Sequence, residues 1–564
     1  MGRLPRLDIF VVSHSGSIEH WWRESVSGER WTHKILHTFA HFTVLCTLWT
    51  FPNAPVLVTE TMSSSVGIVS NARHALWESV VILNTPPSDR KIFRTAQLNL
   101  TSSYWVQRPI VDSVWGSCER DEPLMPLHLS VAKRGKSRTC RGPSSGDLIH
   151  MVLTLLAAGS NACGQLATGS LNDAHHFTPC VFGDSPPGEL PPNTQSIVQL
   201  VSGSNHSLIL LQRTAPGEPD KPRIELWGAG DGSKGQLGPS WSSRTSSSTL
   251  VFQPIDQVPD GYEIAGIAAA WETSYIVFSR DGGDDVLMSM GADDFGDLGV
   301  GGVKKQGNGK ERLIHVVDLA SSIGSIVRGT LKISELVAGP HNAVACLDYV
   351  EVSGRVVQKL VGWGASRQGQ LGVTSRTVSS PLEIRLDQSR PHVTQIALGN
   401  QHSVLRHADG SVTALGSDRK GQFSDISSLQ AVTTVQCTWN GTIVVTTNGG
   451  TPLVLSSGAN QAGQLGRLSG EPTFAPVDLH LDGKLLERIV CGSEHALAIL
   501  NPVDGRGEVW GWGWNEHGNL GRGDTSNVQT PTRLWPPSAG EMDDDPVAVW
   551  AGCGTSWVLV DRKN

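Results

Sequence analysis

Short apolar runs recur along residues 151–564, and each one leads into a glycine-containing turn. The runs are LTLLAA, IELWGA, VLMSM, KLVGW, SVTAL, LVLSS and EVWGW, and each is followed by the pattern G-x-x-x-x-G-[QDN]-[LF]. A short β-prone run bounded by glycine is typical of a strand that delivers the chain into a tight turn. No long amphipathic helix pattern interrupts the series, so the hydrophobic pattern predicts an all-β fold.

The glycine turn occurs seven times, and its first glycines span 354 residues in six steps, a mean of 59 residues. Units of a few short strands cannot bury their faces alone, whereas radial stacking into a closed ring hides faces and edges. The seven copies therefore predict a seven-bladed β-propeller. The structural glycines are Gly159, Gly164, Gly230, Gly235, Gly291, Gly296, Gly364, Gly369, Gly416, Gly421, Gly458, Gly463, Gly513 and Gly518.

Each position of the turn has an expected role. We expect the first glycine to adopt backbone angles that other residues avoid, and the second to allow another segment to approach closely. The apolar residue two positions after the second glycine is expected to fill the gap between neighbouring blades. These residues are Leu166, Leu237, Leu298, Leu371, Phe423, Leu465 and Leu520.

A second signature, G-x-x-H followed by an apolar run, precedes the next glycine turn. It contains His206, His402 and His495, and a related stretch contains His341, whereas three units carry Trp271, Trp439 or Thr555 in this region. A histidine that recurs once per strand is more often a structural hydrogen-bonding group than a metal ligand or a base. Metal binding would require the side chains to converge, so we predict no metal site.

Closure of the ring is expected to involve both ends of the repeat region. An open ring would leave unpaired strand edges, so we predict that the strand near Val152–Ala158 pairs with the strands near Val547–Val560. Truncation at either end should then be severely destabilising.

Composition changes near residue 150. Residues 1–150 contain 8 glycines and 151–564 contain 54; the first part has 16 Lys and Arg against 12 Asp and Glu, the second 29 against 41. These shifts predict a propeller over 151–564 and an N-terminal extension over 1–150. An acidic body disfavours binding to nucleic-acid phosphates, so no direct nucleic-acid partner is expected.

The extension has no consistent period. Residues 6–31 resemble a single repeat of the tandem-repeat propeller lectins, and residues 131–145 form a basic linker, for which a nuclear localisation signal is the alternative interpretation. An orphan repeat lacks the neighbours that a sugar-binding ring needs. A gene-model fusion of residues 1–150 to the propeller is one hypothesis, which N-terminal peptides from the native protein would refute.

The nine cysteines are scattered and form no C-x-x-C pair, which fits reduced thiols in the cytoplasm, with the nucleus as a second compartment. The uncharged stretch Ile35–Phe51 is at the short end of spanning lengths, and we expect no membrane segment. We found no catalytic motif with the required context and expect no cofactor. A chain monomeric by itself is expected.

Aromatic and charged residues near the turns are the candidates for partner binding. Tryptophan and arginine dominate hot spots in protein interfaces, although packing between blades is the competing explanation for the tryptophans. The candidates are Trp271, Trp439, Trp514, Trp557, Arg367, Arg419 and His517.

The glycine turns alternating with G-x-x-H-[SA]-[LV] strands resemble the regulator of chromosome condensation repeat family across 151–564. This resemblance implies a seven-bladed propeller. The units with Trp271–Thr273 and Trp439–Thr442 in place of the histidine make the chain most similar to the fungal alpha-tubulin suppressor, or killer-toxin-insensitivity, propellers.

The subfamily resemblance implies a non-catalytic regulatory partner of a small zinc-binding diphthamide-pathway protein. Such a protein supports diphthamide synthesis and tRNA wobble-uridine modification. The alternative from the same family is a guanine-nucleotide exchange factor for a Ran-type GTPase. No segment clearly matches the wedge that an exchange factor inserts into the GTPase, and we therefore favour the interaction module.

Overall fold

The computed structural model describes residues 152–564, except 216–217, 243–247, 257, 303–312, 324–329, 351–354, 388, 504, 538–543 and 563–564. Before residue 152 it describes the backbone of eight strands. The chain divides into two compact units, Met1–Pro123 and Leu124–Asn564. The predicted boundary at residue 150 stays a prediction, and the basic linker at 131–145 lies outside the described residues.

The N-terminal unit contains a six-stranded antiparallel sheet with the order β3-β2-β1-β4-β5-β6, and a separate pair, β7 and β8. The predicted lectin-like repeat contributes β1 and β2, but β1 also pairs with β4, so the sheet extends beyond the repeat. The bounds are β1 (Leu7–Val12), β2 (Ser17–Arg23), β3 (Thr32–Thr38), β4 (Leu45–Phe51), β5 (Ala54–Glu60), β6 (Val66–Ser70), β7 (Leu76–Ile82) and β8 (Ile92–Asn99).

The apolar stretch Ile35–Phe51 overlaps strands β3 and β4 of this sheet. Across the described residues, no helix has the length and apolar character needed to cross a bilayer.

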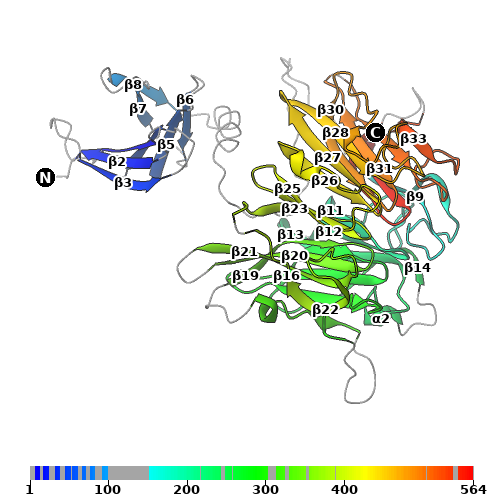
Figure 1. Ribbon diagram of the computed structural model, residues 1–564. Helices are drawn as coiled ribbons and strands as arrows, with labels where there is room; N and C mark the ends of the chain where they lie inside the picture. The colour runs from blue at the N-terminus through cyan, green and yellow to red at the C-terminus, as the bar shows by residue number, and fades with distance from the viewer. Residues whose placement is uncertain are drawn as a thin grey trace, which may run out of the picture. The chain divides into compact units, whose positions relative to one another are not determined.

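The second unit is a seven-bladed propeller, as predicted: seven sheets follow one another along residues 152–562 (Figure 1). We number the blades from the one that contains β9. Blade 1 has the order β34 (Asp545–Ala551), β35 (Thr555–Arg562), β9 (Val152–Gly159) and β10 (Ala174–Pro179). Blade 2 comprises β11 (Thr194–Ser202), β12 (His206–Ala215), β13 (Glu218–Asp231) and β14 (Ser248–Pro254). Blade 3 comprises β15 (Glu263–Ala269), β16 (Thr273–Ser279), β17 (Val286–Gly291) and β18 (His315–Val316).

The remaining blades follow the same up-and-down order, with blade 5 one strand short. Blade 4 comprises β19 (Thr330–Ala338), β20 (Asn342–Val350), β21 (Val356–Ser366) and β22 (Ser375–Glu383). Blade 5 has only β23 (Val393–Leu398), β24 (His402–His407) and β25 (Val412–Gly416). Blade 6 comprises β26 (Val432–Thr438), β27 (Gly441–Asn448), β28 (Thr451–Gly458) and β29 (Ala475–Pro476). Blade 7 comprises β30 (Leu485–Cys491), β31 (His495–Asn501), β32 (Glu508–Gly513) and β33 (Val528–Trp535). Short helical turns lie at α2 (Pro239–Ser242), η1 (Ala320–Ile323) and η2 (Ile426–Ser428).

The ring closes as the sequence predicts, because both ends of the repeat region share blade 1. Strand β35 pairs antiparallel with β9 from Thr555↔Gly159 to Arg562↔Val152, and with β34 on its other side. The C-terminal segment supplies the two inner strands and residues 152–179 supply the two outer ones. Closure therefore joins segments 396–410 residues apart in sequence, and it leaves neither β35 nor β9 with an unpaired inner edge in blade 1.

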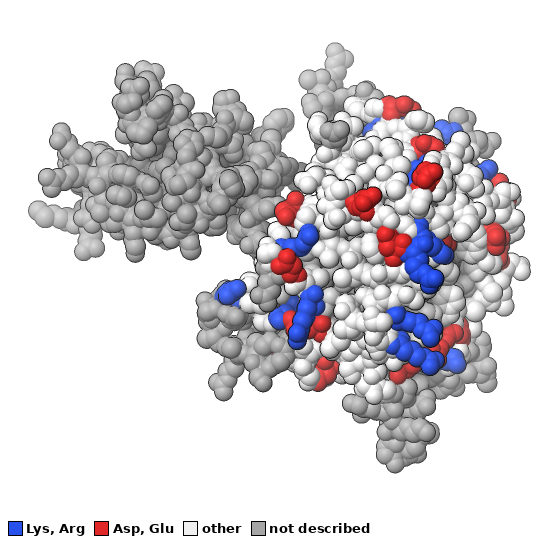
Figure 2. All heavy atoms as spheres, in the orientation of Figure 1, with Lys and Arg blue, Asp and Glu red and all other residues white. Residues whose placement is uncertain are grey.

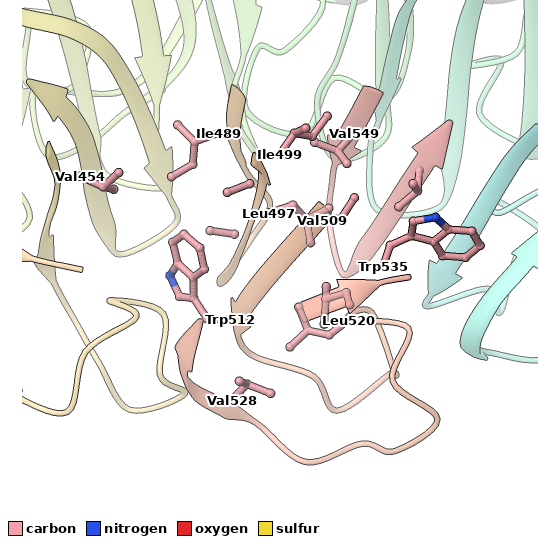
Figure 3. Packing of buried hydrophobic residues seen from close by; sticks show 14 of the residues in the cluster. Val454, Ile489, Leu497, Ile499, Val509, Trp512, Leu520, Val528, Trp535 and Val549 are labelled. Carbon is pink, nitrogen blue, oxygen red and sulfur yellow. The ribbon is translucent and has the colours of Figure 1, made fainter. Parts of the chain in front are cut away.

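The core lies between the sheets. Leu166, Leu237, Leu298, Leu371, Leu465 and Leu520 are at most 1% exposed, as predicted, whereas Phe423 is only partly buried. Figure 3 shows one such cluster, in which Trp512 of blade 7 lies between Val454 of blade 6 and Leu520, and Leu520 lies toward Trp535. The Trp512 Nε1–H also donates to the Gln464 carbonyl at 3.2 Å, which fixes the ring between the two blades.

The repeat glycines are required by geometry. All fourteen have positive φ, as in Gly513 at 104° and Gly518 at 73°. A Cβ on Gly513 would lie 2.5 Å from the Glu494 carbonyl oxygen, and one on Gly518 would lie 2.6 Å from the His175 Cα of the next blade. The expected close approach at the second glycine is therefore confirmed at this position, and the first glycine meets backbone as well.

The recurring histidines link neighbouring blades. Each is fully buried, and its Nε2 lies within hydrogen-bond distance of a hydroxyl in the next blade: His206 at 2.8 Å from Ser274, His402 at 3.1 Å from Thr442 and His495 at 3.0 Å from Ser556. Burial lowers the pKa of each imidazole to about 4, so all three are neutral at pH 7. Ser274 donates its hydroxyl hydrogen to the Gln236 carbonyl, and it therefore accepts the His206 Nε2–H.

The sequence signature groups His341 with the recurring histidines, and this assignment is wrong by one residue. Strand β20 begins at Asn342, and Asn342↔Gly364 takes the register position that His206↔Gly230 takes in blade 2. His341 therefore precedes the strand and lies in a turn.

We expect His495→Ala to lower the free energy of unfolding by about 1–3 kcal/mol, because the buried Ser556 hydroxyl loses its partner. Urea denaturation at pH 7 measures this loss. His480→Ala changes an exposed histidine and serves as the matched control. An equal, small effect of both substitutions would contradict the structural role.

Candidate partner-binding face

In every blade, the glycine turn and the turn before the second strand lie on the same face of the propeller. The first residue of the second strand pairs with the first repeat glycine at the end of the third strand. The turn before the second strand and the glycine turn are therefore neighbours. The pairs are Thr555↔Gly159, His206↔Gly230, Thr273↔Gly291, Asn342↔Gly364, His402↔Gly416, Gly441↔Gly458 and His495↔Gly513. We call this side the turn face, and the turns before the second strands its inner turns.

Backbone hydrogen bonds join the inner turns of successive blades. The Trp271 N–H donates to the Pro340 carbonyl at 2.8 Å, and the Trp271 carbonyl accepts from the Ser204 N–H at 2.9 Å. On the other side of the ring, the Trp439 N–H donates to the Ser493 carbonyl at 2.6 Å, and its carbonyl accepts from Asn400 at 3.0 Å. The backbone that carries both tryptophans is therefore held on each side by a neighbouring blade.

Aromatic side chains from three blades meet in the middle of the turn face. The ring centroids of Trp271 in blade 3 and Trp439 in blade 6 are 5.8 Å apart, although these blades are not neighbours. His341 of blade 4 lies 5.7 Å from Trp271 and 4.5 Å from Phe295. Trp271 remains 37% exposed and Trp439 is partly exposed. We call these four residues the aromatic cluster.

Acidic residues surround the cluster on the side of blades 2 and 3. Glu272 follows Trp271 directly and accepts a hydrogen bond from Asn205 at 3.2 Å, and Asp293 and Asp294 precede Phe295. Asp297 is buried, with only Oδ2 accepting a hydrogen bond, from the Phe295 N–H. Burial, and then the charges of Asp293 and Asp294, raise the pKa of Asp297 to about 7.

Exposed basic residues of the turn face include Lys234 in the glycine turn of blade 2, and others lie in blades 4 and 5. Arg367 and Arg419 are exposed in their glycine turns, and Lys420 Nζ donates to Asn440 Oδ1 at 2.9 Å, next to Trp439. Glu494 of blade 7 accepts from Asn440 and, at 2.9 Å, from Gln464, while its burial raises its pKa. On the side of the propeller that Figure 2 shows, blue and red groups are interspersed and form no continuous basic stripe.

Trp514 and His517 belong to the glycine turn of blade 7, outside the inner turns. Their rings are 5.3 Å apart and nearly perpendicular, and His517 Nδ1 lies 2.7 Å from Asp173 Oδ2 of blade 1. Both residues are on the turn face but join two blades at the point of ring closure. Six of the seven predicted partner-binding residues thus lie on one face.

Trp557 is the exception, and its assignment to a partner surface is wrong. It lies inside β35 within a run of six buried residues and is 0% exposed, so no partner can contact it. Conversely, sequence reasoning missed Phe295 and His341 as members of the aromatic cluster. The signal available was their position, since Phe295 lies in a glycine turn and His341 ends an inner turn.

Metal ligands do not gather on this face in the described ranges. Within 152–564, apart from the gaps given above, no group of three His, Cys, Asp or Glu side chains has the geometry to hold a metal ion. The recurring histidines are in different blades, each directed at a hydroxyl. The arrangement provides an exposed aromatic surface with charged surroundings on a fixed backbone.

Comparisons with known proteins agree with this architecture. The model of the "Regulator of chromosome condensation (RCC1) repeat" matches residues 359–405 and 506–559. The chain is 24% identical to the ultraviolet-B receptor UVR8 of Arabidopsis thaliana, over 66% of this chain and 76% of that protein. It is 25% identical to the secretion-regulating guanine nucleotide exchange factor of Mus musculus, over 74% of this chain and 86% of that protein.

Among solved structures, Prp20p of Saccharomyces cerevisiae matches with a TM-score of 0.51 and 16% identity, covering 74% of this chain and 92% of Prp20p. The predicted resemblance to the RCC1 repeat family is confirmed. The fungal subfamily stays a prediction.

Proposed function

Starting from a seven-bladed propeller of RCC1 repeats, we propose that this protein is a non-catalytic interaction module whose protein partner binds over the aromatic cluster. The observation that carries the proposal is the pairing of Trp271 and Trp439 across the ring while Trp271 stays exposed. Tryptophan is enriched in binding hot spots, and a backbone held by neighbouring blades loses little freedom when a partner binds.

The partner we propose is the small zinc-binding protein of the diphthamide pathway. The support is the sequence resemblance of the Trp271–Thr273 and Trp439–Thr442 units to the fungal propellers, and the tryptophan of each unit belongs to the aromatic cluster. Such a complex would serve diphthamide synthesis and wobble-uridine modification of tRNA. We place it in the cytoplasm and, secondarily, the nucleus, acting as one propeller per complex without a cofactor.

A second candidate is nucleotide exchange on a Ran-type GTPase. It is favoured by the mouse relative, a secretion-regulating guanine nucleotide exchange factor, and by yeast Prp20p, which binds Gsp1p. Release of a labelled GDP analogue from a Ran-type GTPase, measured with and without the full-length protein, separates the two candidates. Acceleration of release would overturn the non-catalytic proposal.

We expect the double variant Trp271→Ala, Trp439→Ala to lose at least about tenfold in partner recovery when the tagged full-length protein is used in nucleotide-depleted lysate. The matched control is Leu485→Ser, which changes a residue 62% exposed at the start of β30, the end of blade 7 away from the turn face. Stoichiometric partners are identified by mass spectrometry. Recovery of the zinc-binding protein with the control but not the double variant supports the proposal, whereas equal recovery with both contradicts it.

A further inference from the structure

Within the described residues, blade 5 lacks the outer strand that every other blade has. Its sheet contains β23, β24 and β25 only, whereas the six other sheets of the propeller have four strands each. The interval from Gly416 to Gly458 is 42 residues, the shortest between successive repeat glycines. In place of an outer strand the chain forms the short turn η2 and then enters β26.

The register of the six complete blades shows what is missing. In each of them the residue two positions before the first repeat glycine pairs with the outer strand. The pairs are Ala157↔Thr178, Gly228↔Gln253, Ser289↔His315, Gly362↔Leu382, Ser456↔Ala475 and Gly511↔Thr532. The counterpart in blade 5 is Ala414, and no strand of the described chain pairs with the outer edge of β25.

A second contact recurs two residues further along five of the six outer strands. In five blades a backbone N–H donates to the carbonyl four residues before the repeat glycine, and its side chain is at most 7% exposed. These bonds are Cys180 to Leu155, Ile255 to Leu226, Val317 to Leu287, Ile384 to Leu360 and Val477 to Val454, at 2.8–3.0 Å. The corresponding carbonyl in blade 5 belongs to Val412.

An open groove of about 400 Å³ lies beside this part of β25. Val412 and Ala414 line it from the strand, Phe423 and Ile426 add apolar surface, and Asp387 and Arg390 add opposite charges from the loop before β23. The groove is therefore next to the backbone groups whose counterparts bind an outer strand elsewhere.

We propose that blade 5 accepts its fourth strand from another protein, as an extended peptide that pairs antiparallel with β25. Addition of a strand to an open sheet edge is a general mode of peptide recognition. All six complete blades supply a residue at the position opposite Ala414. Five of them add one free position and then an apolar residue whose N–H would donate to the Val412 carbonyl.

The free position is proline in three of the five bonded outer strands, at Pro179, Pro254 and Pro476, since its N–H is not needed. The ligand is thus a peptide segment that contains x-Pro-Val or x-Pro-Ile. A segment with another residue in place of the proline, followed by the same apolar residue, also fits. This site is on the rim of blade 5, away from the aromatic cluster, and it does not depend on the proposed function.

The test uses the full-length protein and a fluorescein-labelled peptide, EPTFAPVDLH, which copies residues 471–480 around the outer strand of blade 6. We expect saturable binding by fluorescence polarisation. Methylation of the backbone nitrogen at the valine removes the N–H that would reach Val412 and should weaken binding at least about tenfold.

Ser427→Trp fills the groove and is expected to weaken binding by about the same factor, while Ser428→Trp, an exposed neighbour that does not line the groove, should leave affinity within about twofold. Near-UV circular dichroism checks that both variants fold. Absence of saturable binding would overturn the proposal. Equal binding by Ser427→Trp and the unchanged protein would also overturn it, because the peptide would then be replacing the outer strand of blade 6, which it copies. The protein could instead form a concentration-dependent dimer that Ser427→Trp dissociates. That result would show a second copy of this chain in the groove and would also overturn the proposal.

Discussion

A chain that ends at Gly554, and so lacks β35, is expected not to form a cooperatively folded propeller. Strand β35 pairs with β9 on one side and β34 on the other, so its loss opens the ring and exposes two strand edges in blade 1. It also removes Trp557, Val558, Leu559 and Val560, which are at most 3% exposed. At about 1.5–3 kcal/mol for each buried side chain, the loss is comparable to the whole stability of about 5–15 kcal/mol that a native protein has.

Urea denaturation followed by near-UV circular dichroism measures this effect. The matched control removes residues 1–147, a far longer segment that leaves β9 and β35 in place, and we expect it to retain the unfolding transition of the propeller. A sharp transition at an unchanged urea concentration in the chain ending at Gly554 would contradict the role of β35 in closure. Loss of folding in the control would instead place part of residues 1–147 in the propeller.

The blade number and the closure could be predicted because they depend on local features that repeat. Gly159 and its six counterparts all have positive φ, a requirement that a glycine at a fixed spacing reveals in the sequence. Each of two apolar runs, residues 152–158 and the run near the C-terminus, required a neighbouring strand to bond to its edge. The pairing of Thr555 with Gly159 shows that the two runs bond to each other. Each inference rested on conformational limits that are independent of distant contacts.

The candidate site could be predicted only in part, because exposure and proximity depend on position around the ring. Trp271 and Trp557 both follow small or apolar residues near a blade turn, yet Trp271 precedes its strand and Trp557 lies inside one. The contact between Trp271 and Trp439 joins blades 3 and 6, and no spacing along the chain encodes it. The missing strand of blade 5 was visible only as a shortened interval before Gly458, which acquires meaning once the other outer strands are known.

Replacement of Asp297 by asparagine is expected to stabilise the propeller by up to about 4 kcal/mol at pH 8 and by little at pH 4. Burial raises the pKa of Asp297 to about 7, whereas the pKa of an aspartate in the unfolded chain is about 3.9. Between these values the unfolded state releases a proton that the folded state retains, so the wild-type chain loses about 1.4 kcal/mol per pH unit as the pH rises. Below about pH 4 both states are protonated and this loss disappears.

Asparagine fits this position because blade 7 already has it. Asn519 is the counterpart of Asp297, and its Nδ2 donates to the Trp514 carbonyl at 2.6 Å, while glutamine occupies the position in the other five blades. Urea denaturation at pH 4.5, 6 and 8 should show a gap between Asp297→Asn and wild type that widens with pH. Asp281→Asn changes an exposed carboxylate between β16 and β17 and should shift stability by no more than about 0.5 kcal/mol at any of these values. A gap for Asp297→Asn that stays constant with pH would show that the Asp297 carboxyl ionises in the folded state as readily as in the unfolded one, and that its burial does not control its charge.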